Sequence, residues 1–281
     1  QSFAVTARWI FPVDGPPVER GVIQVEADRI VGLEQRRGSS SLPSGNSVGS
    51  NMLDLGNVAI IPGLVNAHSH LEFASLSKPV QPPSPFTQWI RNLLTHRRER
   101  PQSVADWIAA GSQEAGESGT TLIGDIATGD WSPDCVPDSG PETIAFRELI
   151  GLLPEQADEQ TAIARQHIAA CRKNGRENGS DNGPVNRRVM PGLSPHAPYS
   201  VSMDLFQSLA EIAVRERVPL CLHLAETPAE LEILESGTGE FVEMLAAFGL
   251  WREDLIPCGT RPIDFLRGLA NVETALVAHG N

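Results

Sequence analysis

The chain has few cysteines, no long apolar run and no cluster of basic residues, and each absence argues against a class of protein. Its four cysteines, Cys135, Cys171, Cys221 and Cys258, include no CxxC pair, so a zinc ribbon has no support. No stretch approaches the roughly 18 continuous apolar residues of a membrane-spanning helix, and the N-terminus shows no basic-then-apolar signal segment. The net charge of −13 comes without a Lys/Arg-rich run, which argues against nucleic acids and anionic membranes as partners.

The sparse cysteines are typical of a reducing compartment, so we expect a cytoplasmic protein with Cys221, in its apolar run, as a buried thiol. At 281 residues and 41% hydrophobic content, the chain can bury a large core. No GxGxxG or P-loop motif follows any expected strand, which removes the usual nucleotide-binding interpretations of an open sheet. A nucleotide-sized substrate in a neutral pocket stays compatible with the charge.

Residues 1–60 are predicted to form a small β domain. Gly, Pro and Asp separate its apolar or alternating runs, which favours a small antiparallel sheet. The expected strands cover residues 3–10, 21–26, 29–34 and 52–61. A Gly/Ser/Pro/Asn tract at 37–51 and a polar tract at 176–186 predict loops.

After Pro62 the pattern changes to β-type runs that alternate with helical stretches. The expected strands cover residues 60–67, 119–126, 143–150, 188–193, 219–224 and 271–278. The expected helices cover residues 86–100, 103–118, 155–174, 202–217 and 227–248, the third ending near Gly175. About six β/α steps imply parallel strands joined by right-handed crossovers, as in an open sheet or an unfinished barrel. We favour an α/β fold, a TIM-type (β/α)8 barrel over residues 61–281 that is incomplete at its C-terminus.

A pair of histidines at the end of the first barrel strand has metal-ligand spacing. His68 and His70 alternate on the expected strand, so both imidazoles share one face, as two ligands of one metal require. The pair is equally compatible with two polar residues on an exposed edge. The expected helices disfavour a cupin, and Leu71 and Glu72 stand where a metallo-β-lactamase site would have Asp-His.

A second candidate follows the apolar run that ends at Leu222. A lone histidine such as His223 is more often a hydrogen-bonded core residue than a ligand, but Glu226 lies three residues further on. After the turn this carboxylate could return over the same site, take a proton from water and pass it to a leaving amine. The alternative is a charge at a helix N-terminus, since Thr227 and Pro228 indicate a helix start.

Two further histidines also follow expected strands. His279 ends the last strand and could orient or polarise the water or the substrate, or it could be a terminal residue without a role. His196 lies in the segment SPHAPYS, where two prolines stiffen the loop. A rigid histidine at the rim suits substrate contact, and the alternative is a surface histidine in a Pro-rich turn.

Other titratable residues are not assigned to the site. Asp125 and Glu148 end strands, and either could be a structural carboxylate paired with an arginine or a backbone group. His96 and His167 lie in polar expected helices and are predicted to be solvated.

Together these segments resemble the amidohydrolase superfamily, in its branch of hydrolytic deaminases and chlorohydrolases of aromatic nitrogen heterocycles. PGLVNAHSHLE, SPHAPYS, LHLAET and VAHGN resemble that branch's motifs at the first, fourth, fifth and sixth strands, in the same order. The stretch HSHLEF is similar to aminofutalosine-type deaminases. The N-terminal β segment resembles the first half of the family's small composite β domain.

The resemblance implies one divalent metal ion, zinc or iron, with His68, His70 and His223 as ligands. The family's remaining ligand is an aspartate at the end of the eighth strand, and the sequence given ends at Asn281, before a seventh strand. We therefore expect this sequence to be an N-terminal portion of a longer protein.

The resemblance also implies an activity, the hydrolytic deamination of an amino-substituted N-heterocycle such as a 6-aminopurine nucleoside. Glu226 then resembles the proton shuttle, His279 the residue that holds the attacking water or substrate, and His196 and Glu72 substrate contacts. The alternatives are a chlorohydrolase or amidase with the same site, and a catalytically inactive metal-binding fragment or pseudoenzyme. The missing aspartate favours the inactive form, whereas the presence of Glu226 and His279 disfavours it. The expected partner is a small heterocyclic substrate, and the resemblance makes a homodimer plausible.

Overall fold

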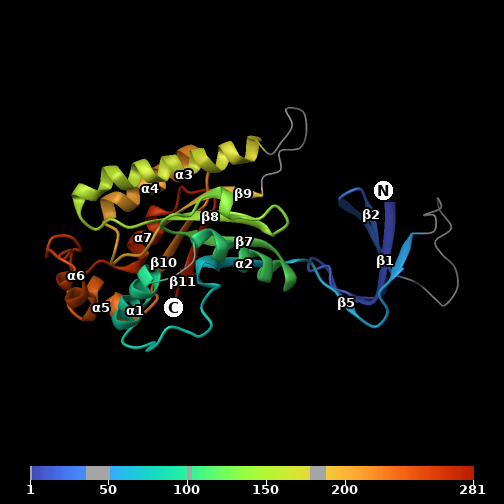
Figure 1. The fold of residues 1–281 in the computed structure, drawn as a ribbon, viewed down its shortest axis with the longest axis horizontal. Coiled ribbons are helices and arrows are strands. Elements are labelled where there is room, and N and C mark those ends of the chain that lie inside the picture. Colours follow the sequence, from blue (N-terminus) through green and yellow to red (C-terminus); the bar gives the residue numbers. More distant parts are fainter. Residues whose placement is uncertain (1, 36–50, 100–102, 178–187) are drawn as a thin grey trace. The chain divides into compact units, whose positions relative to one another are not determined.

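The computed structural model describes residues 2–35, 51–99, 103–177 and 188–281. The chain divides into two compact units, Gln1–Leu64 and Val65–Asn281 (Figure 1). The expected boundary lay between residues 60 and 61. The loop predicted at 37–51 lies outside the described residues apart from Asn51, and so does most of the tract predicted at 176–186.

The N-terminal unit is a five-stranded sheet with the order β3-β2-β1-β4, in which β5 also pairs with β1. Its strands are β1 (Ser2–Ile10), β2 (Val18–Glu26), β3 (Arg29–Gln35), β4 (Met52–Asp54) and β5 (Ala59–Ile60). β1, β2 and β3 are antiparallel as predicted, whereas β4 and β5 join β1 in parallel. The single strand predicted over 52–61 is wrong, because the chain turns at Gly56. This glycine has a φ of 73° and donates its N–H to Asp54 Oδ1.

The second unit is built on six strands that lie side by side in sequence order. They are β6 (Leu64–Ser69), β7 (Thr120–Ala127), β8 (Glu142–Leu149), β9 (Val189–Pro195), β10 (Leu220–Leu224) and β11 (Ala275–His279). Neighbours from β7 to β11 are parallel, and the strands form a nearly closed barrel, which confirms the predicted α/β fold class. Every residue of β10 is buried, because a barrel strand is covered on both faces.

Seven α-helices accompany these strands in the described part of the chain (Figure 1). They are α1 (Phe86–Glu99), α2 (Val104–Glu117), α3 (Ala157–Glu177), α4 (Met203–Glu216), α5 (Pro228–Ser236), α6 (Glu240–Ala247) and α7 (Pro262–Gly268). Ser103 and Ser202 begin α2 and α4, each accepting a backbone N–H from the first helical turn. None of the helices found in the described ranges is long and apolar enough to cross a membrane.

The helices differ from the predicted ones in detail. Residues 227–248 are mostly helical as predicted, but they form two helices, α5 and α6, because Gly237 and Gly239 between them have φ values of 65° and 94°. α3 ends at Glu177, near the predicted end, but Gly175 lies inside the helix and is not its C-cap. The short helix α7 was not predicted, because its seven residues include one buried side chain, Phe265, and therefore show no apolar periodicity.

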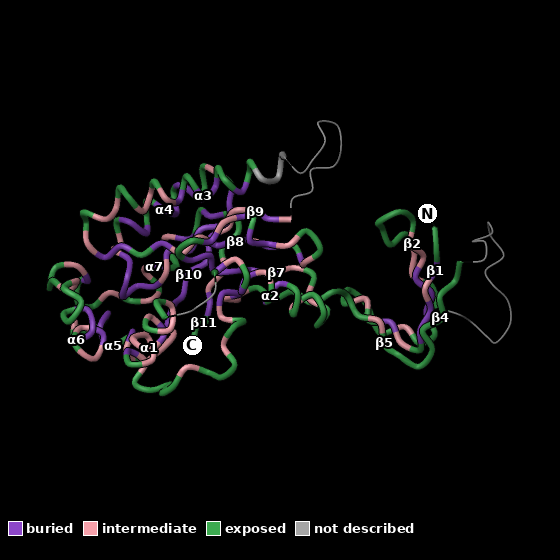
Figure 2. Tube along the Cα trace, viewed as in Figure 1, coloured by how far each residue is buried: buried purple, intermediate pink, exposed green. Residues whose placement is uncertain are grey.

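The largest apolar cluster lies between the barrel strands and the helices that follow β8. Its fully buried members include Phe206, Leu209 and Leu220. Figure 2 shows buried segments along the strands and on the inner sides of the helices. Burying each side chain of this size contributes about 1.5–3 kcal/mol. Cys221 in β10 is also buried, as predicted.

Candidate metal and active site

Three histidines from two strands meet at one end of the barrel. His68 lies in β6, His70 follows β6 directly, and His223 lies in β10. One potential ligand nitrogen from each residue lies within 4.8 Å of the other two. Because the carboxyl ends of parallel barrel strands share one rim, residues far apart in the sequence come together there. Among the described residues, this is the group of potential ligands close enough to share a metal ion.

The three imidazoles lie close together, and each keeps at least one ring nitrogen that could bind a cation. The ring centroids of His68 and His223 lie 4.8 Å apart, and those of His68 and His70 lie 5.2 Å apart. His223 Nδ1 lies 2.9 Å from the carbonyl oxygen of His196, so Nδ1 is the donor and Nε2 stays available for a cation. The Nδ1 atoms of His68 and His70 are buried and have no hydrogen-bond partner among the described residues.

The electrostatics of the cluster keep these imidazoles neutral. Burial, reinforced by the neighbouring histidines, lowers the pKa of His70 and of His223 to about 2. Burial and then the charge of His279 also lower the pKa of His68. A neutral imidazole keeps the lone pair that binds a metal. Neutral imidazoles, buried in His223 and half-buried in His68 and His70, therefore fit a divalent cation such as zinc or iron.

Glu226 lies in the turn between β10 and α5, close to the histidine cluster. Its Oε1 is 3.3 Å from Nε2 of His279. Burial, followed by the charge of Glu230, raises the pKa of Glu226 to about 7. A carboxyl group that titrates near neutrality suits proton transfer in both directions. Glu226 also precedes the start of α5 at Pro228, so its position is compatible with both interpretations of the sequence.

His279 is the last residue of β11 and adjoins the cluster. Its ring centroid lies 5.6 Å from that of His223 and 5.7 Å from that of His68. Its φ of 67° lies in the left-handed region, where histidine is more frequent than most non-glycine residues. The backbone is held there by the N–H of Gly280, which donates to the carbonyl of Leu224. This conformation directs the end of β11 toward the neighbouring strand β10.

His196 follows β9 and is half-buried, with 21% of its side chain exposed, so it is not a freely solvated surface histidine. Its Nδ1 lies 2.7 Å from Ser200 Oγ, and the Ser200 hydroxyl donates to the carbonyl of Ala197. His196 Nδ1 is therefore the donor in this pair. Its Nε2 lies 3.8 Å from Oε1 of Glu148. Burial and the charge of Arg97 lower the pKa of His196 to about 4.

Glu72 lies directly after the histidine pair, in the short 3-10 helix Leu71–Phe73, and is buried. Its Oε1 accepts hydrogen bonds from Arg97 Nη2 at 2.7 Å and from Thr128 Oγ1 at 2.6 Å. The cavity at the histidines is lined by Arg97 but not by Glu72. The substrate contact assigned to Glu72 therefore stays a prediction. Glu72 is connected to the cavity by its hydrogen bond to Arg97, which lines it.

A cavity of about 410 Å³ opens beside the histidines. Its polar lining comprises the histidines together with Arg97, Glu148 and Glu226. Most of the remaining wall is apolar and comes from α1, α6 and their surroundings: Phe73, Phe86, Trp89, Ile90, Leu93, Leu94, Met244, Leu245 and Phe248. The rings of Phe86 and Trp89 stack with centroids 5.3 Å apart. Flat apolar walls with a few convergent polar groups suit an aromatic heterocycle.

Sequence reasoning missed three residues of this site. Arg97 lies near the end of α1, and no sequence spacing connects a residue of this helix to the histidines. Tyr199 lies within SPHAPYS, and its ring stacks on Phe241 at 4.0 Å. Glu230 is fully buried in the first turn of α5. The Thr-x-x-Glu pattern that begins with Thr227 could have drawn attention to it, because this is the sequence of a capping box.

Of the two unassigned carboxylates, Asp125 has the backbone partner expected of a structural carboxylate, whereas Glu148 lines the cavity and pairs with His196. Asp125 accepts hydrogen bonds from the Leu71 N–H at 2.8 Å and from Trp131 Nε1 at 3.0 Å. Glu148 faces His196. Burial is the main reason that the pKa of each carboxyl group rises to about 7.

The two histidines predicted to be solvated, His96 and His167, are both shielded from solvent to some extent. His167 is buried, and its Nε2 lies 2.9 Å from the carbonyl oxygen of Ala145, so that prediction is wrong. His96 is partly buried, with its ring stacked on Trp107 at 5.8 Å. His167 lies on a face of α3 that packs on β8, and His96 packs on α2, contacts that the polar composition of their helices concealed.

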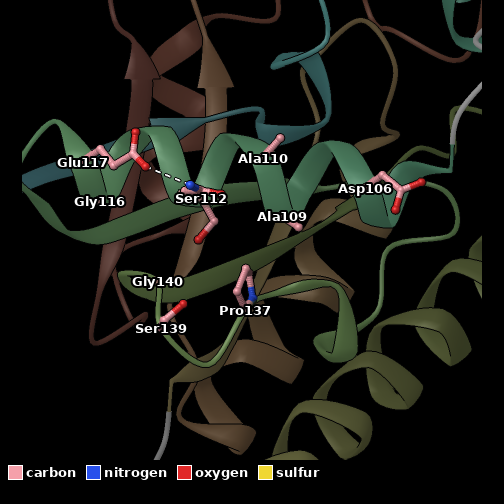
Figure 3. A pocket seen from close by; sticks show the side chains of 10 residues that line it. Asp106, Ala109, Ala110, Ser112, Gly116, Glu117, Pro137, Ser139 and Gly140 are labelled. Carbon is pink, nitrogen blue, oxygen red and sulfur yellow. Dashed lines mark hydrogen bonds between the residues drawn. The ribbon is translucent and has the colours of Figure 1, made fainter.

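A second hollow, of about 550 Å³, lies between α2 and the segment 137–140 (Figure 3). Ser112, Glu117, Pro137 and Ser139 are among its lining residues. Its lining contains no histidine, and the group of potential metal ligands lies at the other cavity. Chemistry rather than size therefore identifies the histidine-lined cavity as the candidate active site.

Comparison with known sequences gives matches over most of the barrel. Residues 59–253 match the profile of the amidohydrolase family. Aminodeoxyfutalosine deaminase from Deinococcus radiodurans is 31% identical over 185 residues, which cover 64% of this chain and 40% of that protein. 5'-Deoxyadenosine deaminase from Methanocaldococcus jannaschii is 28% identical over 194 residues, covering 68% and 44% of the two chains. The matched part thus spans less than half of these relatives.

Solved structures share the fold at low identity. Helicobacter pylori aminofutalosine deaminase in complex with methylthio-coformycin has a TM-score of 0.73 and 18% identity, covering 98% of this chain and 69% of that one. Atrazine chlorohydrolase from Arthrobacter aurescens, complexed with zinc, has a TM-score of 0.64 and 18% identity, covering 98% and 64%. At these identities the likeness shows the fold alone.

Proposed function

This chain belongs to the amidohydrolase family, and on that basis we propose that it carries the metal and proton-transfer site of a hydrolase acting on non-peptide C–N bonds. The proposed reaction is hydrolytic deamination of an amino-substituted N-heterocycle. The observation that carries the proposal is the placement of Glu226 and His279 beside the cluster of His68, His70 and His223. A protein that only binds a metal would need neither Glu226 nor His279.

His68, His70 and His223 would hold one divalent ion, because their ligand nitrogens converge and the buried Nδ1 atoms of the first two have no partner among the described residues. Imidazole donors suit zinc or iron, and zinc is present in the related chlorohydrolase structure. When bound, such an ion supplies Lewis acidity that brings the pKa of water near neutrality. The His223 ring is already oriented for this role by its bond to the carbonyl of His196.

Glu226 acts as the proton shuttle in the proposed reaction. Its carboxylate takes a proton from the attacking water while the water oxygen bonds to the ring carbon that carries the amino group. The same carboxyl group then delivers the proton to the departing nitrogen, the C–N bond breaks, and ammonia leaves. The hydroxyl proton left on the ring carbon moves to the adjacent ring nitrogen, which gives the ring carbonyl. A pKa of about 7 fits both steps at neutral pH. His279, 3.3 Å from Glu226, holds the attacking oxygen in line.

The substrate we propose is a purine-nucleoside-like heterocycle, supported by the names of the two relatives, which are deaminases of aminodeoxyfutalosine and 5'-deoxyadenosine. The stacked Phe86 and Trp89 give the cavity a flat wall for a ring system. His196 would contact the substrate, with Glu72 contributing through its hydrogen bond to Arg97. The homodimer and the cytoplasmic location stay predictions from the sequence.

The test is a substrate panel assayed for ammonia release with the metal-loaded, full-length protein. The panel contains 6-aminopurine nucleosides, simple amino-heterocycles and their chloro analogues. We expect ammonia from at least one amino compound, and loss of that activity with retained metal in Glu226→Gln. The exposed Glu235 on α5 provides the control Glu235→Gln, which should behave as the unchanged protein.

Other outcomes would redirect the assignment. Chloride release without ammonia release would assign the site to the chlorohydrolase alternative. Near-normal turnover of Glu226→Gln would refute the shuttle role. Bound metal without turnover of any compound would favour the inactive metal-binding form.

A further inference from the structure

Glu230 is a buried carboxylate that holds the turn on which Glu226 sits. It lies in the first turn of α5 and has no solvent exposure. Its Oε1 accepts the N–H of Ala225 at 2.9 Å, and its Oε2 accepts the N–H of Glu226 at 3.0 Å. Both oxygens of one side chain are thus used on two consecutive backbone amides.

These bonds are not an ordinary helix cap. The start of α5 is already capped by Thr227, whose side chain accepts the N–H of Glu230. In a capping box the glutamate would bond the N–H of the N-cap residue itself. Glu230 instead reaches past Thr227 to the two residues before it. Its position therefore serves the turn between β10 and α5 rather than the helix.

The turn needs such a restraint because its backbone is strained. Ala225 has a φ of 54°, in the left-handed region. For a residue other than glycine this conformation is strained and persists only when its surroundings enforce it. The two hydrogen bonds that the Glu230 carboxylate accepts from consecutive backbone amides stabilise this strained turn. Without them the turn would relax and carry the Glu226 side chain away from His279.

A carboxylate at position 230 also affects the pKa of Glu226. Glu230 stands close enough to Glu226 that its charge, after burial, helps to raise the pKa of Glu226 to about 7. Placing two acidic groups together inside the protein costs stability. A restraint with only a structural purpose could use a neutral acceptor and avoid this cost.

We propose that Glu230 is a positioning residue, whose two carboxylate oxygens fix the backbone of Ala225 and Glu226 so that the Glu226 carboxylate stays beside His279. The inference rests on the proposed function, because that function assigns proton transfer to Glu226. It adds a residue that acts through the backbone rather than through contact with substrate.

The test compares Glu230→Gln and Glu230→Asp with the control Glu235→Gln in the metal-loaded, full-length protein. Glutamine has one acceptor oxygen for two N–H groups, and aspartate keeps the charge but shortens the reach. We expect kcat per folded, metal-loaded molecule to fall by up to about 100-fold in both variants, as for a catalytic group displaced by 1 Å. KM and metal content should stay within about 3-fold, and amide hydrogen exchange at residues 225 and 226 should speed up.

The pH profile separates positioning from plain structural support. The titratable groups that face Glu226 are Glu230 on its own turn and helix, His279 at the end of β11, and Tyr199 after β9. Removing the charge in Glu230→Gln should move the acidic limb of kcat to lower pH. Glu230→Asp should leave that limb in place.

Two results would overturn the proposal. One is unchanged kcat per folded molecule in both variants. The other is unchanged amide exchange at residues 225 and 226. The exchange measurement does not depend on turnover, so it still decides the role of Glu230 if the unchanged protein releases no ammonia. Failure of the inference and failure of the proposed function are therefore distinguishable.

Discussion

Gly124 in β7 provides a way to disturb the histidine pair without touching it. A Cβ built on Gly124 would lie 2.2 Å from the carbonyl oxygen of Ala67 and 2.9 Å from its carbonyl carbon. Real Cβ contacts are essentially never shorter than 3.0 Å. Ala67 directly precedes His68 in β6. Gly124→Ala must therefore displace the strand that carries His68 and His70.

The size of the displacement follows from these distances. The carbonyl of Ala67 must retreat by about 0.8 Å to reach 3.0 Å from the new methyl group. It is backbone within a sheet, so it cannot rotate away as a flexible side chain would. Overpacking of this kind costs about 1–3 kcal/mol. Changes that disorient metal ligands typically reduce metal affinity about 10- to 100-fold, and we expect Gly124→Ala to fall in this range.

The assay is competition for zinc against a chromophoric chelator, together with urea unfolding of the metal-free protein. Gly116→Ala is the matched control, because its Cβ would lie 3.5 Å from Pro141 Cδ, an ordinary contact. Gly116 lies in α2, where alanine is favoured over glycine by about 0.5–1 kcal/mol. Equal zinc affinity of the two variants would refute the reasoning, since it would mean that β6 absorbs the methyl group without moving its histidines.

Three further results follow from the same structure. Removing the metal with a chelator should lower the melting temperature and added zinc should restore it, because a ligand of the folded state stabilises that state. In His223→Ala, chelator and zinc should leave the melting temperature unchanged. Burial lowers the pKa of His167 from 6.5 to about 4, so between these pH values the folded state binds fewer protons than the unfolded state. The free energy of unfolding, measured with urea, should therefore fall as the pH drops from 6.5 to 4. The fall should be less steep in His167→Gln. Phe206→Ala should cost about 3–5 kcal/mol in the same assay, whereas exposed Leu231→Ala should stay within about 0.5 kcal/mol.

The order of strands and the rim histidines could be predicted because each depends on local sequence. A barrel strand is buried on both faces, so it reads as an apolar run, and a polar residue at its end stands out. His223 after Leu222 and His279 after Ala278 are such cases. The parallel fold then brings these ends together without further information. The convergence of His68, His70 and His223 therefore follows from local patterns plus one topological rule.

The supporting residues could not be predicted in this way, because their roles depend on distances between elements. Arg97 reaches Glu72 across 25 residues of sequence, and no periodicity encodes that contact. His167 reads as solvated in a polar helix, yet the helix packs this face on β8, where its ring meets the carbonyl of Ala145. Glu230 carries a capping signature that predicts a helix start but not its two bonds to the preceding turn.

The three candidate metal ligands come together through the fold itself. His68, His70 and His223 are brought together by strand order, which the apolar core enforces whether or not a cation is present. Their burial and mutual repulsion disfavour protonation, so the cluster stays neutral. Buried polar nitrogens without partners cost about 1–3 kcal/mol each. A divalent cation bound by these nitrogens would relieve that cost, so we expect metal binding to stabilise the folded state.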